Sequence, residues 1–195
     1  LDFQAGKDVG LGVFGNSVLS AGVRFAQFTA STDVTIQSQP TNINAYGYYH
    51  VFRAKFDTTR HFNGIGPSVS WTASTNLLGN PSSGAIAFDW GVNGSVLFGR
   101  QHVNEEHQTT DNYKHQFQYL NISTAHGGAP RIRGVVVPNL GGFAGLSWRA
   151  PNAKVTFGYR ADFFFGAVDG GIDARKTYDR GFFGPYAAVS VGLGG

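Results

Sequence analysis

The stretch that decides the fold is GAIAFDWGVNGSVLFG, residues 84–99. From Ile86 to Phe98 every second side chain except Gly94 is large and apolar, and the side chains between them are mostly small or polar. Successive side chains of a β-strand point to opposite faces of a sheet. The stretch therefore predicts a strand with one apolar face and one polar face. We call each set of alternate positions a parity. The apolar parity holds Ile86, Phe88, Trp90, Val92, Val96 and Phe98, and the polar parity holds Ala85, Ala87, Asp89, Asn93 and Ser95.

Six further segments follow the same alternation, and none shows the apolar 3.6-residue period with caps that marks a helix. In residues 154–166, Phe157 and Phe163 lie on the apolar parity, whereas Arg160 and Asp162 lie on the other. The sequence therefore predicts an all-β fold. The seven predicted strands are residues 2–13, 18–29, 64–74, 84–99, 135–149, 154–166 and 182–193.

The links between these segments alternate between short turns and long polar loops. We expect long external loops at about 30–50, 104–130 and 169–179. This alternation is typical of an up-and-down antiparallel transmembrane β-barrel. We expect a single barrel domain over residues 1–195, with seven strands visible and eight or more in the complete barrel. The first and last visible strands run in the same direction, so we expect an odd number of strands, most simply one, before Leu1.

The composition supports this class of protein. Charged residues make up 14% of the chain, against roughly 25% in an average soluble domain. There are 28 Gly, 17 Phe and no Cys, so disulfides and thiol chemistry are excluded. The sequence contains no run of 18 apolar residues, so it predicts no transmembrane helix. Lys and Arg are scattered, which argues against a nucleic-acid partner.

Alternation alone does not say which face of a barrel points inward. A soluble barrel is apolar inside, whereas a membrane barrel is apolar outside. The polar parity here is rich in Gly, Ser, Ala, Thr and Asn and has few charges, which suits a cramped interior better than a solvated exterior. We therefore expect the apolar side chains to face lipid. The expected lumen polar network is Asp8, Arg24, Asp89, Arg160, Asp162 and Tyr186, and the expected lipid-facing residues are Phe88, Trp90, Phe157, Phe163 and Val189.

Several short motifs rich in glycine and aromatic residues follow one another along the chain. They are Phe62-Asn-Gly-Ile-Gly-Pro67, Leu97-Phe-Gly99, Val137-Pro-Asn-Leu140, Gly145-Leu-Ser147, Gly158-Tyr-Arg-Ala-Asp-Phe163 and Arg180-Gly-Phe-Phe-Gly-Pro-Tyr186. Their order and spacing, from about Asp2 to Leu193, resemble the Legionella-type major outer membrane proteins, which are pore-forming bacterial barrels. The resemblance implies an outer-membrane location, a porin-like or structural role and no catalytic motif. The sequence departs from the usual barrel ending, because it closes on Gly192-Leu-Gly-Gly195 without a terminal aromatic residue.

These observations leave three functional interpretations open. The first is a porin-like barrel in the outer membrane of a Gram-negative cell envelope, with passive passage of ions or small solutes through a narrow polar lumen. The alternative is a structural or surface-recognition (adhesin-like) barrel with a plugged lumen, because eight strands leave an interior that side chains can fill. The expected partners are outer-membrane lipid and lipopolysaccharide, and a homo-oligomer or an envelope protein is possible in either case.

A third reading, a lipid or peptide hydrolase at the barrel rim, is the weakest. Four histidines and three acidic residues fall in or beside the loop expected at 104–130. Their spacing matches no metal-ligand pattern, and no Ser lies in a recognisable nucleophile context. We therefore expect no enzyme activity, catalytic residue, metal or cofactor. The residues are His102, His107, His115, His126, Glu105, Glu106 and Asp111.

Overall fold

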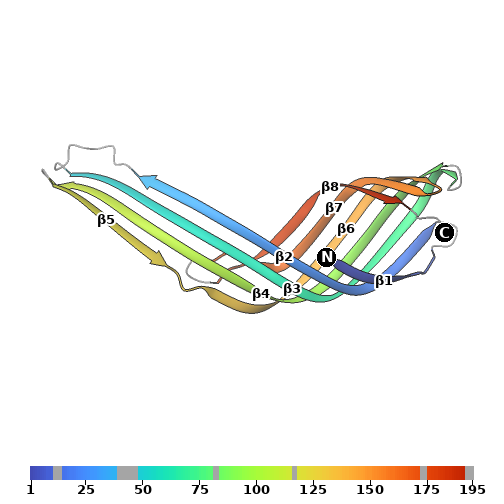
Figure 1. The fold of residues 1–195 in the computed structure, drawn as a ribbon, viewed down its shortest axis with the longest axis horizontal. Helices are drawn as coiled ribbons and strands as arrows, with labels where there is room; N and C mark the ends of the chain where they lie inside the picture. Colours follow the sequence, from blue (N-terminus) through green and yellow to red (C-terminus); the bar gives the residue numbers. More distant parts are fainter. Residues whose placement is uncertain (11–14, 39–47, 81–83, 116–117, 172–174, 192–195) are drawn as a thin grey trace.

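Over the residues that the structure describes, the chain forms a single antiparallel sheet of eight strands (Figure 1). A computed structural model describes residues 1–10, 15–38, 48–80, 84–115, 118–171 and 175–191. Within these ranges there is no helix long and apolar enough to cross a membrane. The strands are β1 (Asp2–Asp8), β2 (Asn16–Ser38), β3 (Tyr48–Asn80), β4 (Gly84–His115), β5 (Gln118–Gly127), β6 (Arg131–Ala150), β7 (Ala153–Asp169) and β8 (Thr177–Val191).

The strands pair in the up-and-down order β1-β2-β3-β4-β6-β7-β8, and β5 pairs with the far end of β4. All pairs are antiparallel. The all-β, up-and-down prediction is therefore confirmed. The sheet is curled but not closed, since β1 and β8 are its two edges over the described residues. These edges run in the same direction, so they have no antiparallel register with each other.

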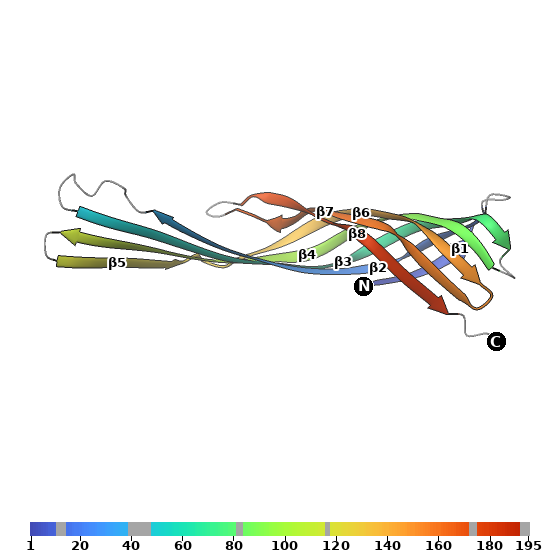
Figure 2. The ribbon, with the colours of Figure 1, turned by 90° about the horizontal axis from the view of Figure 1, so that it is seen from above.

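Each of the seven predicted segments contains a strand, but β2, β3 and β4 run much further than predicted. Beyond the curled sheet they continue with β5 as a narrow arm (Figures 1 and 2). We call this arm the extension. It comprises β2 from Ala30, β3 up to Arg60, β4 from Asn104, and β5.

The expectation of long loops at 30–50 and 104–130 is wrong over most of both segments. Residues 30–38, 48–50, 104–115 and 118–127 are strand instead. The ladder from Ala30↔Arg60 to Ser38↔Phe52 is continuous, so backbone hydrogen bonds hold a segment that has no apolar face to bury. Residues 39–47 and 116–117 lie outside the described part of the chain. The link expected at 169–179 is shorter, because β7 ends at Asp169 and β8 begins at Thr177.

The two faces of the curled sheet differ as alternation requires. Large apolar side chains on the outer face are exposed, including Val92 at 48% and Leu140 at 59%. Polar or small side chains on the inner face are buried, such as Ser95 at 7% and Ser147 at 2%. This is the reverse of a water-soluble fold, in which the apolar face is covered.

Candidate functional site: the polar inner face

An arginine on the inner face of the curled sheet connects its own strand to three others. Val23 and Phe25 face outward, so alternation turns Arg24 of β2 inward, where it is 5% exposed. Its Nε and Nη2 atoms donate to the two carboxylate oxygens of Asp2 at 2.6 and 2.8 Å. Its Nη1 atom donates to Asn93 Oδ1 of β4 at 2.7 Å and to Asn139 Oδ1 of β6. Arg24 is thus a charged crosslink between β1, β4 and β6.

Asp162 of β7 extends this network. Its carboxylate lies 3.9 Å from Arg24 Nη1 and accepts a hydrogen bond from Arg160 Nε at 2.6 Å. A Cβ atom at Gly141 would lie 2.1 Å from Asp162 Oδ1, so the missing side chain there leaves room for the carboxylate. With Asp2, the network holds two arginines and two carboxylates. This balance avoids an unpaired buried charge.

A second charged cluster lies nearer the short turns. Asp89 of β4 is 4% exposed and accepts a hydrogen bond from the Ser74 hydroxyl. Lys154 Nζ lies 2.5 Å from one of its carboxylate oxygens, and Arg149 Nη2 lies 3.1 Å from the other. These side chains and Tyr186 line a cavity of about 400 Å³. Two cations face one carboxylate, so the cavity is positively charged.

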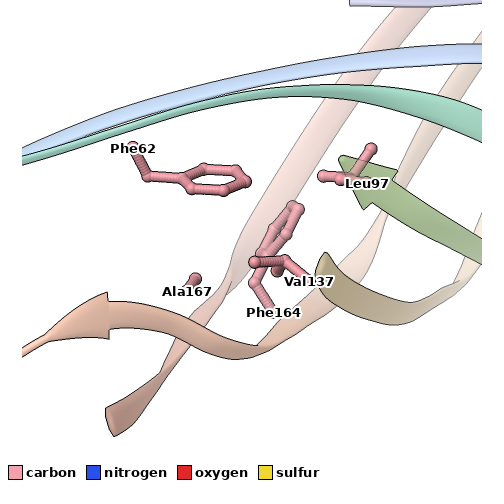
Figure 3. Close-up of a cluster of buried hydrophobic side chains, with 5 residues drawn as sticks. All are labelled: Phe62, Leu97, Val137, Phe164 and Ala167. Carbon is pink, nitrogen blue, oxygen red and sulfur yellow. The ribbon is translucent and has the colours of Figure 1, made fainter. Parts of the chain in front are cut away.

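Apolar side chains cover the inner face on the extension side of Arg24. The Phe28 ring stacks on Phe62 with centroids 5.0 Å apart, and lies 4.9 Å from Phe164 and 5.6 Å from Phe182. Side chains from β2 and β8 therefore meet across the interior, although the two strands do not pair. We call these four rings the phenylalanine layer. Figure 3 shows two of them, Phe62 and Phe164, with the buried side chains packed around them: Leu97, Val137 and Ala167.

A third charged group lies beyond the phenylalanine layer. Arg131 donates to both carboxylate oxygens of Glu105, at 2.8 and 3.0 Å, and its Nε lies 3.5 Å from Asp169 Oδ2. The hydrogen bond to Glu105 raises the pKa of Arg131 above its ordinary value. Arg60 Nε donates to the backbone oxygen of Asp169 at 2.8 Å. These bonds tie β3, β4 and β6 to the end of β7.

The structure brings together only part of the predicted lumen network. Arg24, Arg160 and Asp162 form one cluster, while Asp89 and Tyr186 line the separate cavity. Asp8, also predicted for this network, joins neither cluster within the described residues. Its side chain is exposed at the end of β1, where the carboxylate accepts a hydrogen bond from Gly10 N at 2.9 Å. Asp before a turn commonly bonds the backbone two residues ahead in this way.

The five residues expected to face lipid all lie on the outer face. Four are well exposed: Phe88 at 38%, Phe163 at 44%, Phe157 at 65% and Val189 at 71%. Trp90 is half-buried because its ring packs against Trp71, with centroids 5.0 Å apart. Contact of these side chains with lipid stays a prediction.

The prediction missed five residues that complete the two inner clusters. The parity rule places all of them on the inner face, so alternation was the available signal. The missed residues are Asp2, Asn93, Asn139, Arg149 and Lys154.

The histidines near the extension are held by local contacts. The His102 Nε2 atom shares a hydrogen bond with Asn104 Oδ1 at 2.9 Å, and the His102 ring lies 6.2 Å from that of His61. Glu105 is engaged by Arg131, and Glu106 and His107 are exposed. No three His, Asp or Glu side chains gather as metal ligands within the described ranges. The side chains of Asp111, His115 and His126 lie outside the described part.

Comparison with known proteins adds no family to this fold. No protein-family model matches the chain, and a search of the curated proteins finds no match. The resemblance to Legionella-type major outer membrane proteins therefore stays a prediction. Fold and site define a class: an up-and-down antiparallel sheet, apolar on its outer face and polar on most of its inner face.

Proposed function

We propose that this chain forms the wall of a bacterial outer-membrane β-barrel, and that its polar inner face lines a porin-like passage for ions or small solutes. The observation that carries the proposal is the reversed sheet, with exposed apolar side chains outside and ion pairs inside. Lipid is the solvent in which such an outer face is favourable. The direct partners are then membrane lipid and the head groups of lipopolysaccharide.

The edge of the apolar band supports this location. One outward row of paired residues crosses four neighbouring strands and is apolar throughout. The next outward row toward the extension contains no large apolar residue. The apolar row is Phe25, Ile65, Phe98 and Val136, and the next row is Gln27, Asn63, Arg100 and Gly134. A change this sharp, in register over four strands, is expected where a sheet leaves the hydrocarbon layer.

The height of the band is also appropriate. On β4 the exposed apolar residues run from Ile86 to Phe98. At ~3.4 Å per residue this is roughly 40 Å of strand, or roughly 30 Å of height at the ~45° tilt of membrane strands. The hydrocarbon core of a bilayer is ~30 Å thick. The same ends are marked on β6, where Val136 pairs with Phe98 and Trp148 pairs with Ile86.

The inner face supports a passage because it carries paired charges of both signs. The Arg24 network and the Asp89 cluster occupy successive levels along β4, at Asn93 and Asp89. Hydrated ions are stabilised by such groups, whereas an inner face made only of apolar side chains excludes them. The excess of cations around Asp89 favours anions over cations.

The phenylalanine layer favours a second candidate, a structural or surface-recognition barrel with a plugged interior. Rings from β2, β3, β7 and β8 meet across the inner face, and an apolar constriction hinders ion flow. The extension, which reaches far beyond the curled sheet (Figure 1), suits recognition at a cell surface.

Conductance of the purified full chain in planar lipid bilayers separates the two candidates. The passage predicts discrete conductance steps that favour anions, and Lys154→Gln should reduce this selectivity. Arg100→Gln, a change on the outer face, is the matched control and should leave it unchanged. Phe62→Ala should raise the conductance by thinning the phenylalanine layer. A flat trace for both the unmodified chain and Phe62→Ala would reject the passage and favour the plugged barrel.

A further inference from the structure

A pocket lies on the extension side of the phenylalanine layer, outside both inner charged clusters. It has a volume of about 210 Å³ and takes lining residues from β2, β3, β4, β7 and β8. Phe28, Phe62, Phe182 and Ala167 form an apolar floor. Gln101, 4% exposed, lies in the wall and donates to Gly166 O at 2.8 Å. Its mixed lining, an apolar floor with polar groups in the wall, is typical of a small-molecule site, and its volume suits a ligand smaller than most such sites hold.

Two arginines stand at this floor without a compensating carboxylate. Arg60 is anchored by Asp169 O at 2.8 Å and Thr32 Oγ1 at 3.3 Å, which leaves its Nη2 without a partner among the described residues. The Arg180 guanidinium lies 5.8 Å from the Phe182 ring and forms no ion pair within the described ranges.

The lining holds a single carboxylate, that of Asp169, which is bonded to groups other than Arg60 and Arg180. Its Oδ1 accepts hydrogen bonds from Gly171 N and Lys176 N, both at 3.1 Å, and its Oδ2 faces Arg131 Nε at 3.5 Å. Two guanidinium groups, those of Arg60 and Arg180, stand against this one carboxylate, so the lining keeps a net positive charge. The pocket combines an aromatic floor with a net positive rim.

We propose that this pocket binds a small aromatic carboxylate of about the size of benzoate. Its ring lies on the apolar floor and its carboxylate lies between Arg60 and Arg180. A cavity of ~150 Å³ lined by apolar side chains holds benzene, so about 210 Å³ accommodates a ring with one carboxylate. Guanidinium groups bind carboxylates through paired, charge-assisted hydrogen bonds. The site needs no passage through the sheet, so it holds for either candidate function.

Titration of the full chain in detergent micelles with 4-fluorobenzoate, followed by ¹⁹F NMR, tests the proposal, with empty micelles as the blank. Saturable binding is expected. The neutral 4-fluorobenzyl alcohol and the ringless trifluoroacetate should each bind at least about tenfold more weakly. The alcohol lacks the carboxylate that the arginines bind, and trifluoroacetate lacks the ring that lies on the apolar floor. Equal binding of the alcohol, or no saturation above the blank, would overturn the proposal.

Variants locate the binding. Arg180→Gln should weaken the binding of 4-fluorobenzoate about tenfold, because it removes one of the two guanidinium groups that contact the carboxylate. The fold should survive this change, because Arg180 is exposed and packs against the Phe182 ring. Arg100→Gln, an equal change of charge on the outer face, should leave the affinity unchanged. Equal affinity of Arg180→Gln and the unmodified chain would place the ligand elsewhere and refute the site. Because the readout is binding, a channel that fails to conduct does not affect it.

Discussion

At the scale of single residues, the inner face depends on Arg24. Its guanidinium is bonded to one carboxylate and two side-chain amides, and lies near a second carboxylate. Truncating one partner of a buried pair leaves the others with uncompensated charge, which costs more than the pair contributes. Arg24 therefore has a structural role whether or not water passes beside it.

We predict that Arg24→Ala lowers the free energy of unfolding by about 3–5 kcal/mol, because Asp2 and Asp162 lose their shared cation. Urea unfolding in lipid vesicles, followed by tryptophan fluorescence, measures the change. Arg100→Ala removes the same charge from an exposed position and should change stability by less than about 1 kcal/mol. Similar losses for the two variants would show that the Arg24 network does not stabilise the sheet.

At the scale of strands, β3 and β4 approach closely at Gly66. A Cβ atom there would lie 1.8 Å from the backbone oxygen of Val96, which is too close for any side chain. Position 134 on β6 is the opposite case, since a Cβ atom at Gly134 would meet nothing within 4 Å. One glycine is required by strand pairing and the other is not.

Gly66→Ala should therefore destabilise the sheet by about 1–3 kcal/mol, as other overpacked sites do. Gly134→Ala should be neutral or slightly stabilising, because alanine is less flexible than glycine in the unfolded chain. The same urea titration compares them. Equal midpoints for the two variants would contradict the close approach of β3 and β4.

The strands with one apolar face were predictable from the sequence, and the extension was not. Ile86 to Phe98 alternate because one side of β4 is polar and the other apolar. Residues 31–37 are exposed on both faces, so their sequence does not alternate between apolar and polar residues as that of a half-buried strand does. Their signal was weaker: the β-branched Thr32, Val34, Thr35 and Ile36, which favour strands.

For the candidate site, the sequence predicted only the face of the sheet on which its residues lie. Parity places Arg24, Asp89 and Asp162 on the inner side, but it does not say at which level along the strands each lies. Register decides that level, and it joins Arg24 to Asn139, 115 residues away in the sequence. The phenylalanine layer was missed for a different reason: Phe28 and Phe164 lie at alternate positions interpreted as polar, and Phe62 lies outside the predicted strand 64–74.

At the scale of the whole molecule, the sheet divides into two parts in different surroundings. The curled part exposes many large apolar side chains, whereas the extension exposes mostly polar side chains and ion pairs, with Val34 and Ile36 as exceptions. Lys55 of the extension, for example, lies 2.9 Å from Asp57, and this hydrogen bond raises the pKa of the lysine. We infer that the curled part lies in lipid and the extension in water.

A charge on the outer face of the curled part should therefore oppose membrane insertion. Phe157→Arg, at a side chain 65% exposed, should cost about 2–4 kcal/mol if it lies near the bilayer centre. Thr35→Arg in the extension is the matched control and should cost almost nothing. Folding yield into lipid vesicles is the measurement. A normal yield for Phe157→Arg would place its side chain outside the hydrocarbon.

Collision rates of spin labels along β4 test the orientation of the sheet most directly. The chain has no cysteine, so single cysteines can be introduced without background labelling. In vesicles, labels at Phe88, Val92 and Val96 should collide frequently with oxygen, which concentrates in lipid, and labels at Ala87 and Ser95 should not. If labels at Phe88, Val92 and Val96 instead collide mainly with a water-soluble nickel complex, the outer face does not lie in a membrane.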